Sequence, residues 1–390
     1  MSGSSGRNEP FGHHLKPEFL LDPEIAYLNH GAHGAPPREV IEAAHEAQRR
    51  MEREPSRFVE REFRPRLREV AAELAGYLGA DGANLALVEN ASVGVNVVLR
   101  GLEFSPGDEI LITDQTYGAV RNAVRYVAAR TGAVPVEAAL PFPTEAPEQI
   151  VEAFARHLGP RTRLAIIDHI TSPTALVLPL AELVARAKAA GAQVLVDGAH
   201  APGMLPLALS DLGADWYTGN CHKWLMAARG TAFLWAAEQV RASTHPLVIS
   251  HGYEQGFTRE FDWIGTRDAF AQFALPAALA YRRRHGEAAI RAYNHDLVMA
   301  ASEMLAARWG TAAGGPATMT GSMRAVRLPD GFEATAEAAQ ALRWRLADDY
   351  QVPVPVRCLA GGLWARLSAQ IYNEIGDYER LGEAIAALRP

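Results

Sequence analysis

Cysteine, an excess of positive charge and long apolar runs are all scarce in this chain of 390 residues. Only two cysteines occur, Cys221 and Cys358, and a secreted protein of this size usually carries more, in pairs, so a reducing cytoplasm is the expected compartment. No apolar run approaches the roughly 18 residues of a membrane-spanning helix, so we expect no membrane partner. Lys and Arg number 38 against 45 Asp and Glu, without a basic stripe, which argues against a nucleic-acid partner.

Two further signatures are missing. No G-x-S-x-G elbow follows any apolar run, which argues against an α/β-hydrolase. Asp197 and His200 are too few for a convincing set of metal ligands, and we expect no metal. The first six residues are small and polar with no apolar segment behind them, so we interpret them as a flexible arm or an expression-tag remnant rather than a signal peptide.

Between residues 83 and 237, short β-rich runs alternate with helical patterns. Several of the runs are continuously apolar, as expected for strands buried on both faces of a mostly parallel sheet. We expect seven strands, at residues 84–89, 109–114, 134–140, 164–170, 193–198, 214–218 and 230–236. Helical patterns at 117–130 and 180–190 lie between them. This alternation predicts a large doubly wound α/β domain.

The pattern changes after about residue 270. Helical segments at 277–286, 288–309, 334–350 and 377–388 flank short strands at 325–328, 352–356 and 363–368, which is typical of a smaller α+β domain. We therefore divide the chain into an N-terminal arm (1–28) that packs with the small domain, a large domain (29–268) and a small C-terminal domain (269–390).

Polar residues gather where the predicted parallel strands end. In an open α/β sheet, ligands bind beyond the carboxyl ends of the strands. Four runs end in polar segments, at 89–92, 114–117, 168–172 and 197–200, and Lys223 follows the sixth run. Helix capping accounts for some Asp and Ser at such positions. Four such ends and a lysine exceed what capping needs, so we predict a ligand site there.

Lys223 and Asp197 together suggest a cofactor. A lysine that forms a Schiff base must be partly neutral and so needs a desolvated site, and the apolar Trp224 and Leu225 follow Lys223. Asp197 ends an apolar strand, where a carboxylate is costly unless it is paired. The protonated pyridine nitrogen of pyridoxal 5′-phosphate (PLP) is such a partner. Alone, Lys223 would be an ordinary loop residue and Asp197 a helix cap or metal ligand; together they predict PLP bound to Lys223.

Two more segments suit parts of this cofactor. Residues 90–94 precede a helical run, so their amides and the Ser92 hydroxyl can cradle a phosphate. Tyr117 begins the next helix, where its ring can lie flat on a planar group. Each feature alone has an ordinary explanation, since a serine often caps a helix and an aromatic residue is often part of the core.

Eight segments, in order, resemble the class V aminotransferase group of fold-type I PLP enzymes, and specifically its isopenicillin N epimerase-like branch. They are residues 27–31, 90–92, 114–118, 168–174, 197–203, 219–224, 262–268 and 366–373. The resemblance implies that Lys223 is the Schiff-base lysine and proton shuttle, that Asp197 pairs with the pyridine nitrogen and that His200 lies near the phenolic oxygen. The remaining cofactor contacts that it implies are Tyr117 on the ring, Ser172, and Ala91, Ser92, Asn220 and His222 around the phosphate.

The resemblance also implies a partner and a substrate. Thr266 would reach the phosphate of a neighbouring subunit, which implies a homodimer with shared sites. Arg366 would bind the α-carboxylate of an amino-acid substrate bidentately, beside Asn29. His33 departs from the family pattern, in which an aromatic residue is common, and it makes the substrate side more polar.

Class V members include transaminases, cysteine desulfurases, C–S lyases and epimerases, which all begin by removing the α-proton of an amino acid. A desulfurase needs a cysteine on a mobile loop, whereas Cys221 adjoins the lysine as a small buried residue and Cys358 falls in a predicted strand. We therefore predict a C–S lyase or an epimerase, with an aminotransferase or a desulfurase as the alternative. A regulatory or scaffold protein is the non-enzyme alternative, and the presence of both Lys223 and Arg366 argues against it.

Overall fold

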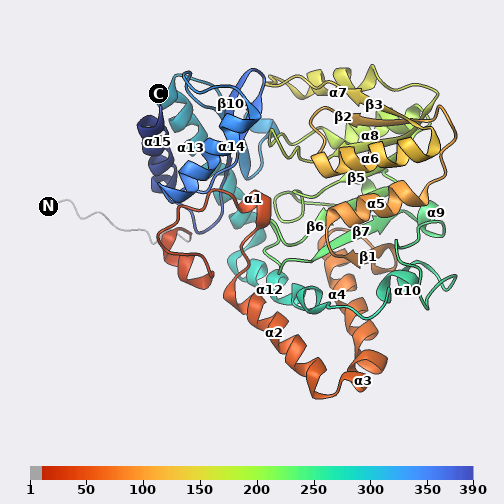
Figure 1. Cartoon of the computed structure of the whole chain (residues 1–390). Coiled ribbons are helices and arrows are strands. Elements are labelled where there is room, and N and C mark those ends of the chain that lie inside the picture. Colours follow the sequence, from red (N-terminus) through yellow and green to blue (C-terminus); the bar gives the residue numbers. More distant parts are fainter. Residues whose placement is uncertain (1–10, 390) are drawn as a thin grey trace.

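The computed structural model describes residues 11–389 and contains two β-sheets (Figure 1). The larger sheet has seven strands in the order β1-β7-β6-β5-β4-β2-β3. Strand β7 is antiparallel to both of its neighbours, and the other pairs are parallel. The strands are β1 (Leu85–Val88), β2 (Glu109–Thr113), β3 (Val134–Ala138), β4 (Thr162–Asp168), β5 (Gln193–Asp197), β6 (Trp216–Asn220) and β7 (Ala232–Ala236). The predicted α/β class with a mostly parallel seven-stranded sheet is confirmed.

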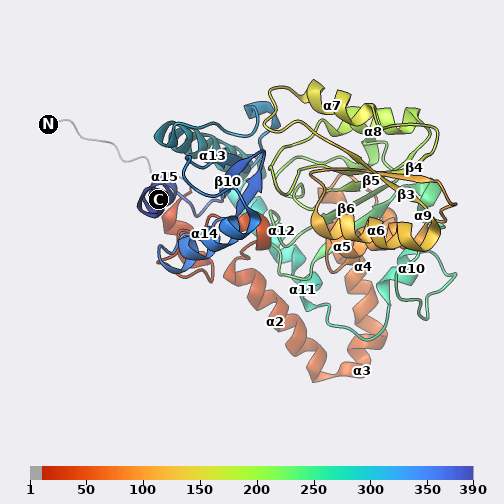
Figure 2. The same cartoon turned by 45° about the horizontal axis from the view of Figure 1, so that its top comes forward.

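Helices cover both faces of this sheet. In Figure 2, α5 (Ala91–Gly101) and α6 (Gly118–Thr131) lie on one side, and α7 (Pro147–Ala155) and α8 (Leu180–Ala189) on the other. The strands β5, β6 and β7 are buried along almost their whole length, which explains why their sequences are continuously apolar rather than alternating. Because β2 to β6 run parallel to one another, the loops that follow the carboxyl ends of these strands collect at one edge of the sheet.

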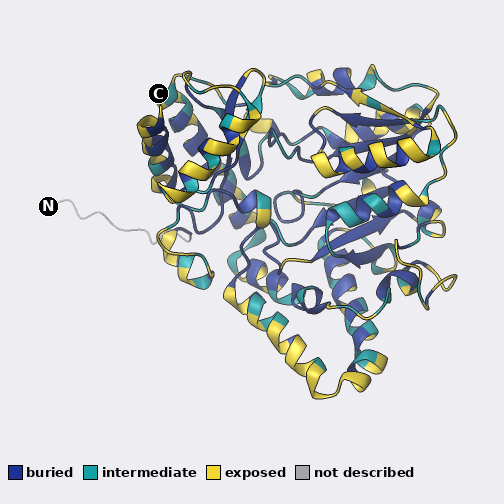
Figure 3. Cartoon of the chain, in the orientation of Figure 1, coloured by how far each residue is buried: buried dark blue, intermediate teal, exposed yellow. Residues whose placement is uncertain are grey.

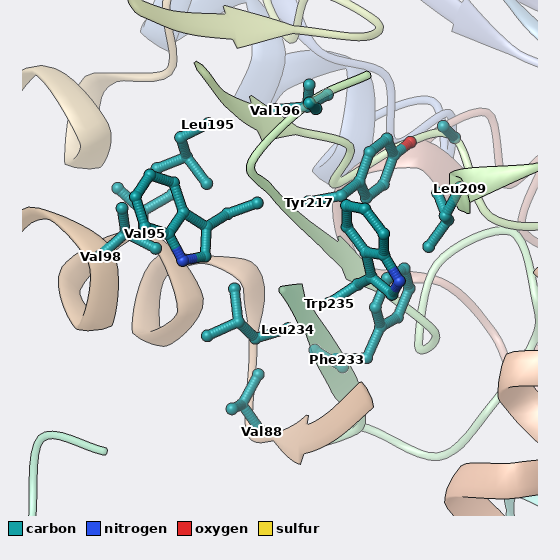
Figure 4. Packing of buried hydrophobic residues seen from close by; sticks show 14 of the residues in the cluster. Val88, Val95, Val98, Leu195, Val196, Leu209, Tyr217, Phe233, Leu234 and Trp235 are labelled. Carbon is teal, nitrogen blue, oxygen red and sulfur yellow. The ribbon is translucent and has the colours of Figure 1, made fainter. Parts of the chain in front are cut away.

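Successive residues of the central strands point to opposite faces, so both faces hold core side chains. Figure 4 shows Leu195 and Leu234 on the α5 side with Val95 and Val98, and Val196, Tyr217 and Trp235 on the other side. Full burial of one such aliphatic or aromatic side chain stabilises the fold by roughly 1.5–3 kcal/mol. The sheet is therefore a rigid support for the loops at its edge.

The smaller sheet has three antiparallel strands in the order β8-β10-β9: β8 (Met323–Arg327), β9 (Val356–Leu359) and β10 (Gly362–Ser368). Helices α13 (Glu287–Trp309), α14 (Ala336–Asp348) and α15 (Ile375–Leu388) pack with it and enclose a second hydrophobic core. Figure 1 shows this part at the left, beside the larger sheet.

The N-terminal segment joins this smaller part. The amides of Ala26 and Leu28 donate hydrogen bonds to the carbonyl oxygens of Gln351 (3.0 Å) and Pro353 (3.2 Å), and both side chains belong to the second core. The boundaries 28/29 and 268/269 that we drew from the sequence stay a prediction. The segment 1–6, interpreted as an arm or a tag remnant, lies outside the described residues.

The strand predicted at 352–356 is wrong, because β9 begins only at Val356. The buried Val352 and Val354 alternate with Pro353 and Pro355, which have no backbone N–H to donate to a ladder. The alternation thus reflects burial of an irregular segment and not strand pairing.

Several helices had no counterpart in the sequence prediction. They are α1 (His30–His33), α2 (Arg38–Arg53), α3 (Pro55–Arg57), the π-helix η2 (Phe58–Glu62), α4 (Phe63–Tyr77), α7, α9 (Glu238–Arg241), α10 (Phe257–Asp262) and α11 (Phe270–Phe273). Helix α12 (Leu275–His285) was expected. Figure 3 shows that α2 and α3 project from the body of the molecule with largely exposed surfaces. Within residues 11–389, none of the helices has the length and apolar character needed to cross a membrane.

Candidate active site

A cavity of about 380 Å³ opens at the carboxyl ends of β4, β5 and β6, where the polar residues were predicted to converge. Ten of the thirteen predicted site residues line it: His33, Ala91, Ser92, Tyr117, Ser172, Asp197, His200, Asn220, His222 and Lys223. An adjoining cavity of about 160 Å³ is lined by Asn29 and Arg366 and shares His33, Tyr117, Ser172 and Lys223 with the first. Thr266 lines neither cavity and is exposed.

Lys223 lies on the loop between β6 and β7, and neighbouring residues fix the backbone of this loop. The Nη1 atom of the fully buried Arg282 donates to the carbonyl oxygen of Trp224 (2.7 Å), and Nε2 of His30 lies 3.0 Å from the carbonyl oxygen of Lys223. Gly34 has a φ of +67°, and a Cβ atom there would lie 1.9 Å from the carbonyl oxygen of His222. Glycine is therefore required where the segment after α1 crosses the lysine loop.

The amine of Lys223 is held in a state close to neutral. Burial lowers its pKa to about 7, the positive charge of Arg366 acts in the same direction, and Asp197 opposes both. Its Nζ atom lies 3.3 Å from Nε2 of His200. Burial also lowers the pKa of His200 well below the usual value, so this imidazole is neutral. Since Trp224 Nε1–H points at His200 Nδ1 (3.5 Å), the ring proton is on Nε2 and faces Lys223.

Two carboxylates lie on the floor of the cavity. Asp168 and Asp197 end the paired strands β4 and β5, opposite each other in the register. Burial raises the pKa of both, and the charge of Asp197 raises the pKa of Asp168 further. Asp168 accepts a hydrogen bond from the Thr116 hydroxyl (3.1 Å), and Asp197 accepts one from the Ala199 amide (3.0 Å). A cation that binds here would be stabilised by these buried carboxylates.

The N-terminus of α5 forms another wall. Its capping residue Asn90 accepts a hydrogen bond from the Val93 amide (3.0 Å), and Asn220 accepts one from the Ala91 amide (2.9 Å). A Cβ atom at Gly94 would lie 2.1 Å from Oγ1 of Thr218, so glycine lets the helix approach β6 closely. The helix therefore presents its positive dipole end to the cavity, where an anion is favoured.

Arg366 on β10 is 4% exposed. Its Nη1 donates to the backbone oxygen of Ser172 (2.6 Å) and lies 3.3 Å from the Ser172 hydroxyl. Burial lowers the pKa of this guanidinium to about 10, so it stays charged at neutral pH. Two buried atoms beside the second cavity, Nε of Arg366 and Oδ1 of Asn29, have no hydrogen-bond partner in the described part of the chain. A ligand with both donor and acceptor groups would satisfy them.

The sequence analysis missed several lining residues. Arg343 on α14 and Arg357 on β9 line the second cavity, and Asn90 and Asp168 line the first. Asn90 and Asp168 fell within segments already singled out at strand ends, so that signal was available. Arg343 and Arg357 carried no such signal, because helix packing in the smaller part brings them to the site.

These residues fit PLP. The buried carboxylate of Asp197 suits a protonated pyridine nitrogen, and the Nε2–H of His200 suits a phenolic oxygen. The half-exposed ring of Tyr117 (48%) offers a stacking face, and the α5 N-terminus with Ser92 and His222 suits a phosphate. The described residues contain no group of three or more His, Cys, Asp or Glu side chains that could hold a metal ion.

Neither cysteine belongs to the cavities. Cys221 is fully buried, and this burial raises the pKa of its thiol strongly. Cys358 lies on β9, where its Sγ is 3.0 Å from the backbone oxygen of Ala334. Neither thiol lines either of the two cavities.

The class-V aminotransferase family profile matches residues 26–341. The chain is 34% identical to an L-cysteine desulfhydrase of Arabidopsis thaliana, with 93% of this chain and 88% of that relative covered. It is 35% identical to isopenicillin N epimerase of Amycolatopsis lactamdurans, with 95% and 97% covered. Its fold matches that of the cystine C–S lyase C-DES, solved in complex with cysteine persulfide, with a TM-score of 0.78 at 22% identity over 94% of this chain and 98% of that one.

Proposed function

The chain belongs to the class-V aminotransferase family, and from this premise we propose that it is a C–S lyase that splits S-substituted cysteines. The protein is a PLP-dependent enzyme that acts on an amino acid and is of the lyase or epimerase type. The observation that carries the proposal is the buried Lys223 amine, whose pKa of about 7 and contact with His200 suit it to take a proton at neutral pH.

The cofactor, when bound, supplies an electron sink that stabilises the negative charge left at the α-carbon. We propose that Lys223 carries the cofactor and that Asp197 keeps the pyridine nitrogen protonated. In the same proposal His200 donates to the phenolic oxygen, Tyr117 covers the ring, and Ser172 contacts the cofactor beside Arg366. The residues around the phosphate end are Asn90, Ala91, Ser92, Asn220 and His222.

On the substrate side, we propose that Arg366 binds the α-carboxylate. Asn29 and His33 contact the neighbouring polar atoms of the substrate. In this proposal the substrate's amine takes the place of the Lys223 amine, and the released Lys223 amine then removes the α-proton. The bond from the β-carbon to sulfur then breaks, and the thiolate leaves with a proton. Hydrolysis of the remaining three-carbon fragment gives pyruvate and ammonium, so the overall reaction consumes one water.

Lyase chemistry is preferred to desulfuration because desulfuration must leave a persulfide on a protein cysteine. Cys221 is shut inside the core and Cys358 lies in a paired strand, and neither reaches the substrate side. Epimerisation is the second candidate. It needs a proton donor on the face opposite Lys223, and Tyr117 and His33, which line both cavities, are suited to that role.

A homodimer is part of the proposal. The segment before Thr266 exposes large apolar side chains, Leu247 (39%), Val248 (51%), Ile249 (56%) and Tyr253 (49%). Leu247, Val248 and Ile264 line one shallow apolar pocket, so the patch continues toward Thr266. A contiguous exposed apolar patch commonly marks an interface.

We also propose a cytoplasmic location. The proposed division is an N-terminal arm, a large domain and a small domain, with boundaries at residues 28/29 and 268/269.

One experiment separates the candidates. The purified holoenzyme is incubated with S-ethyl-L-cysteine in deuterium oxide, and the α-deuterium content, the chirality of the recovered substrate and the pyruvate are measured together. A lyase gives pyruvate and ethanethiol in equal amounts. An epimerase gives α-deuterated D-isomer without pyruvate, and that result would replace the lyase proposal.

A further inference from the structure

The charged side chains that line the second cavity are all positive. Its charged lining residues are the three arginines Arg343, Arg357 and Arg366; Lys223 and His33 also line it, and no carboxylate of the described chain does. The substrate role proposed above uses only one of the three guanidinium groups, that of Arg366. Arg343 and Arg357 therefore remain to be explained.

Arg343 and Arg357 lie on two elements of the smaller part that pack together, α14 and β9. Arg343 is half-buried and Arg357 is exposed, whereas Arg366 is buried. The cavity is thus lined by one buried guanidinium and two more accessible ones.

Neither outer arginine has an acidic partner within 4.0 Å among residues 11–389. The contrast with the same helix is direct, because Arg345, two residues further along α14, pairs with Asp349 at 3.6 Å. Arg324 and Arg327 of the smaller part also have carboxylate neighbours, at 3.9 Å from Glu303 and 3.0 Å from Asp330. The two outer arginines instead face a cavity and a third arginine.

This arrangement costs stability in the absence of an anion. The charges of Arg343 and Arg357 both act to lower the pKa of Arg366, and Arg343 acts in the same way on His33. Like charges in one cavity repel, and the repulsion is relieved when an anion binds between them. The α-carboxylate neutralises one of the three charges, and a second negative group would neutralise another and reduce the remaining repulsion.

We propose that Arg343 and Arg357 select substrates that carry a second acidic group at the far end of the side chain. This inference deepens the proposed function, and the substrate class it names is an S-substituted cysteine whose sulfur substituent ends in a carboxylate, or in a sulfinate or sulfonate of similar size. Arg366 holds the α-carboxylate, and the outer pair holds the distal acid. Both charged ends are then fixed, and the α-carbon is presented to Lys223.

The kinetic test uses two substrates that differ only in charge. S-carboxymethyl-L-cysteine and its neutral isostere S-carbamoylmethyl-L-cysteine are compared as substrates of the holoenzyme by pyruvate release. We expect kcat/KM to be about five- to tenfold or more higher for the acid, because two partly exposed charge pairs are gained. Arg343→Gln and Arg357→Gln should each reduce this ratio toward one with little effect on the amide. Arg345→Gln, on the same helix but outside the cavity, should leave it unchanged.

A binding measurement keeps the inference independent of the reaction. Calorimetric titration of the holoenzyme with glutarate and with glutaramate, which has one carboxylate and one amide, reports recognition of the second acid directly. We expect glutarate to bind about fivefold or more tightly, and the preference to disappear in Arg343→Gln/Arg357→Gln but not in Arg345→Gln.

The outcomes are distinguishable. Glutarate preference that depends on the outer arginines, without pyruvate from either sulfur compound, overturns the lyase proposal and retains acid recognition. Pyruvate from both sulfur compounds at equal kcat/KM, with equal binding of glutarate and glutaramate, overturns acid recognition and retains the lyase. A preference for the acid that survives the double variant also overturns the assignment to these two residues.

Discussion

Nζ of Lys223 lies 3.3 Å from Nε2 of His200, and the far nitrogen of the same imidazole faces the indole N–H of Trp224, the residue that follows the lysine. The lysine loop therefore fixes the ring that contacts its own amine. Because His200 is neutral, its Nε2–H can donate to the lone pair of an uncharged Lys223 amine but not to an ammonium group. The pair favours the form of lysine that reacts with an aldehyde.

The first prediction concerns the covalent link. The sequence contains only three lysines, Lys16, Lys188 and Lys223, so borohydride reduction followed by peptide mapping gives a clear answer. We expect the reduced cofactor only on the peptide with Lys223, because Lys16 is bound to a backbone carbonyl and Lys188 is paired with Asp215 (2.8 Å). Lys223→Ala should abolish the yellow colour that survives dialysis. A label on Lys16 or Lys188 would contradict the assignment.

The second prediction is the pH dependence of cofactor capture by the apoprotein. Only the neutral amine reacts, and burial lowers the pKa of Lys223 from the ordinary 10.5 to about 7. The capture rate should thus rise as the pH increases through 7 and reach a plateau, whereas an ordinary lysine would continue to gain rate up to pH 10.5. Stopped-flow absorbance measures this rate. His200→Ala should move the midpoint upward, and an unchanged midpoint would show that the imidazole does not stabilise the neutral amine.

The third prediction concerns the α-carboxylate. Removal of one partner from a buried, hydrogen-bonded charge pair costs on the order of 2–5 kcal/mol. Arg366→Gln should therefore reduce kcat/KM for amino-acid substrates by a corresponding factor, with PLP affinity nearly unchanged, because Arg366 lines the second cavity and not the first. Cofactor content and steady-state rates are measured on the same preparation. The native enzyme should also reject amines that lack the carboxylate, and equal reaction of both would contradict this role.

The fourth prediction addresses the cysteines. In Cys221→Ala/Cys358→Ala, pyruvate release from S-substituted cysteines should persist at close to the native rate, because neither thiol lines the site. Cys221 is buried, so some loss of stability is expected, and the melting temperature is recorded alongside the rate. If the native enzyme instead releases alanine from cysteine and the double variant loses that reaction, desulfuration is the true activity.

The fifth prediction is subunit complementation. Lys223→Ala and Thr266→Ala subunits are each purified and then mixed under conditions that allow exchange. If Thr266 serves the partner's phosphate site, one of the two sites in a mixed dimer has both groups intact, and activity should appear that neither parent shows. If sedimentation shows a monomer at micromolar concentration and this monomer is fully active, a shared site is excluded.

The larger sheet and the cofactor cavity could be predicted from the sequence because their signals are local. A buried parallel strand is apolar along its length, and its first polar residue marks the edge where ligands bind, as Asp168 and Asp197 do. The residues themselves indicated Ser92, Tyr117, Asp197 and Lys223. His33, Ala91, Ser172, His200, Asn220 and His222 were assigned through the family resemblance, and all ten line the first cavity.

The substrate side could not be predicted in the same way. Arg343 is one of several charged residues on an ordinary helix, and Arg357 follows an irregular segment whose prolines disguised the true start of β9. Their positions depend on how α14 and β9 dock against the larger sheet, which no run of neighbouring residues encodes. Arg366 was identified only through family resemblance.

The contact of residues 11–28 with residues 351–373 has a consequence for protein synthesis. The Gly12 amide donates to the carbonyl oxygen of Ile371 (2.8 Å), and Ala26 and Leu28 join the second core beside Val352 and Val354. This N-terminal segment is translated before the larger sheet, whereas its partners are translated after it. On a growing chain, the larger sheet can thus form before the substrate side exists. The nascent polypeptide would then acquire its cofactor pocket before the residues that determine its specificity.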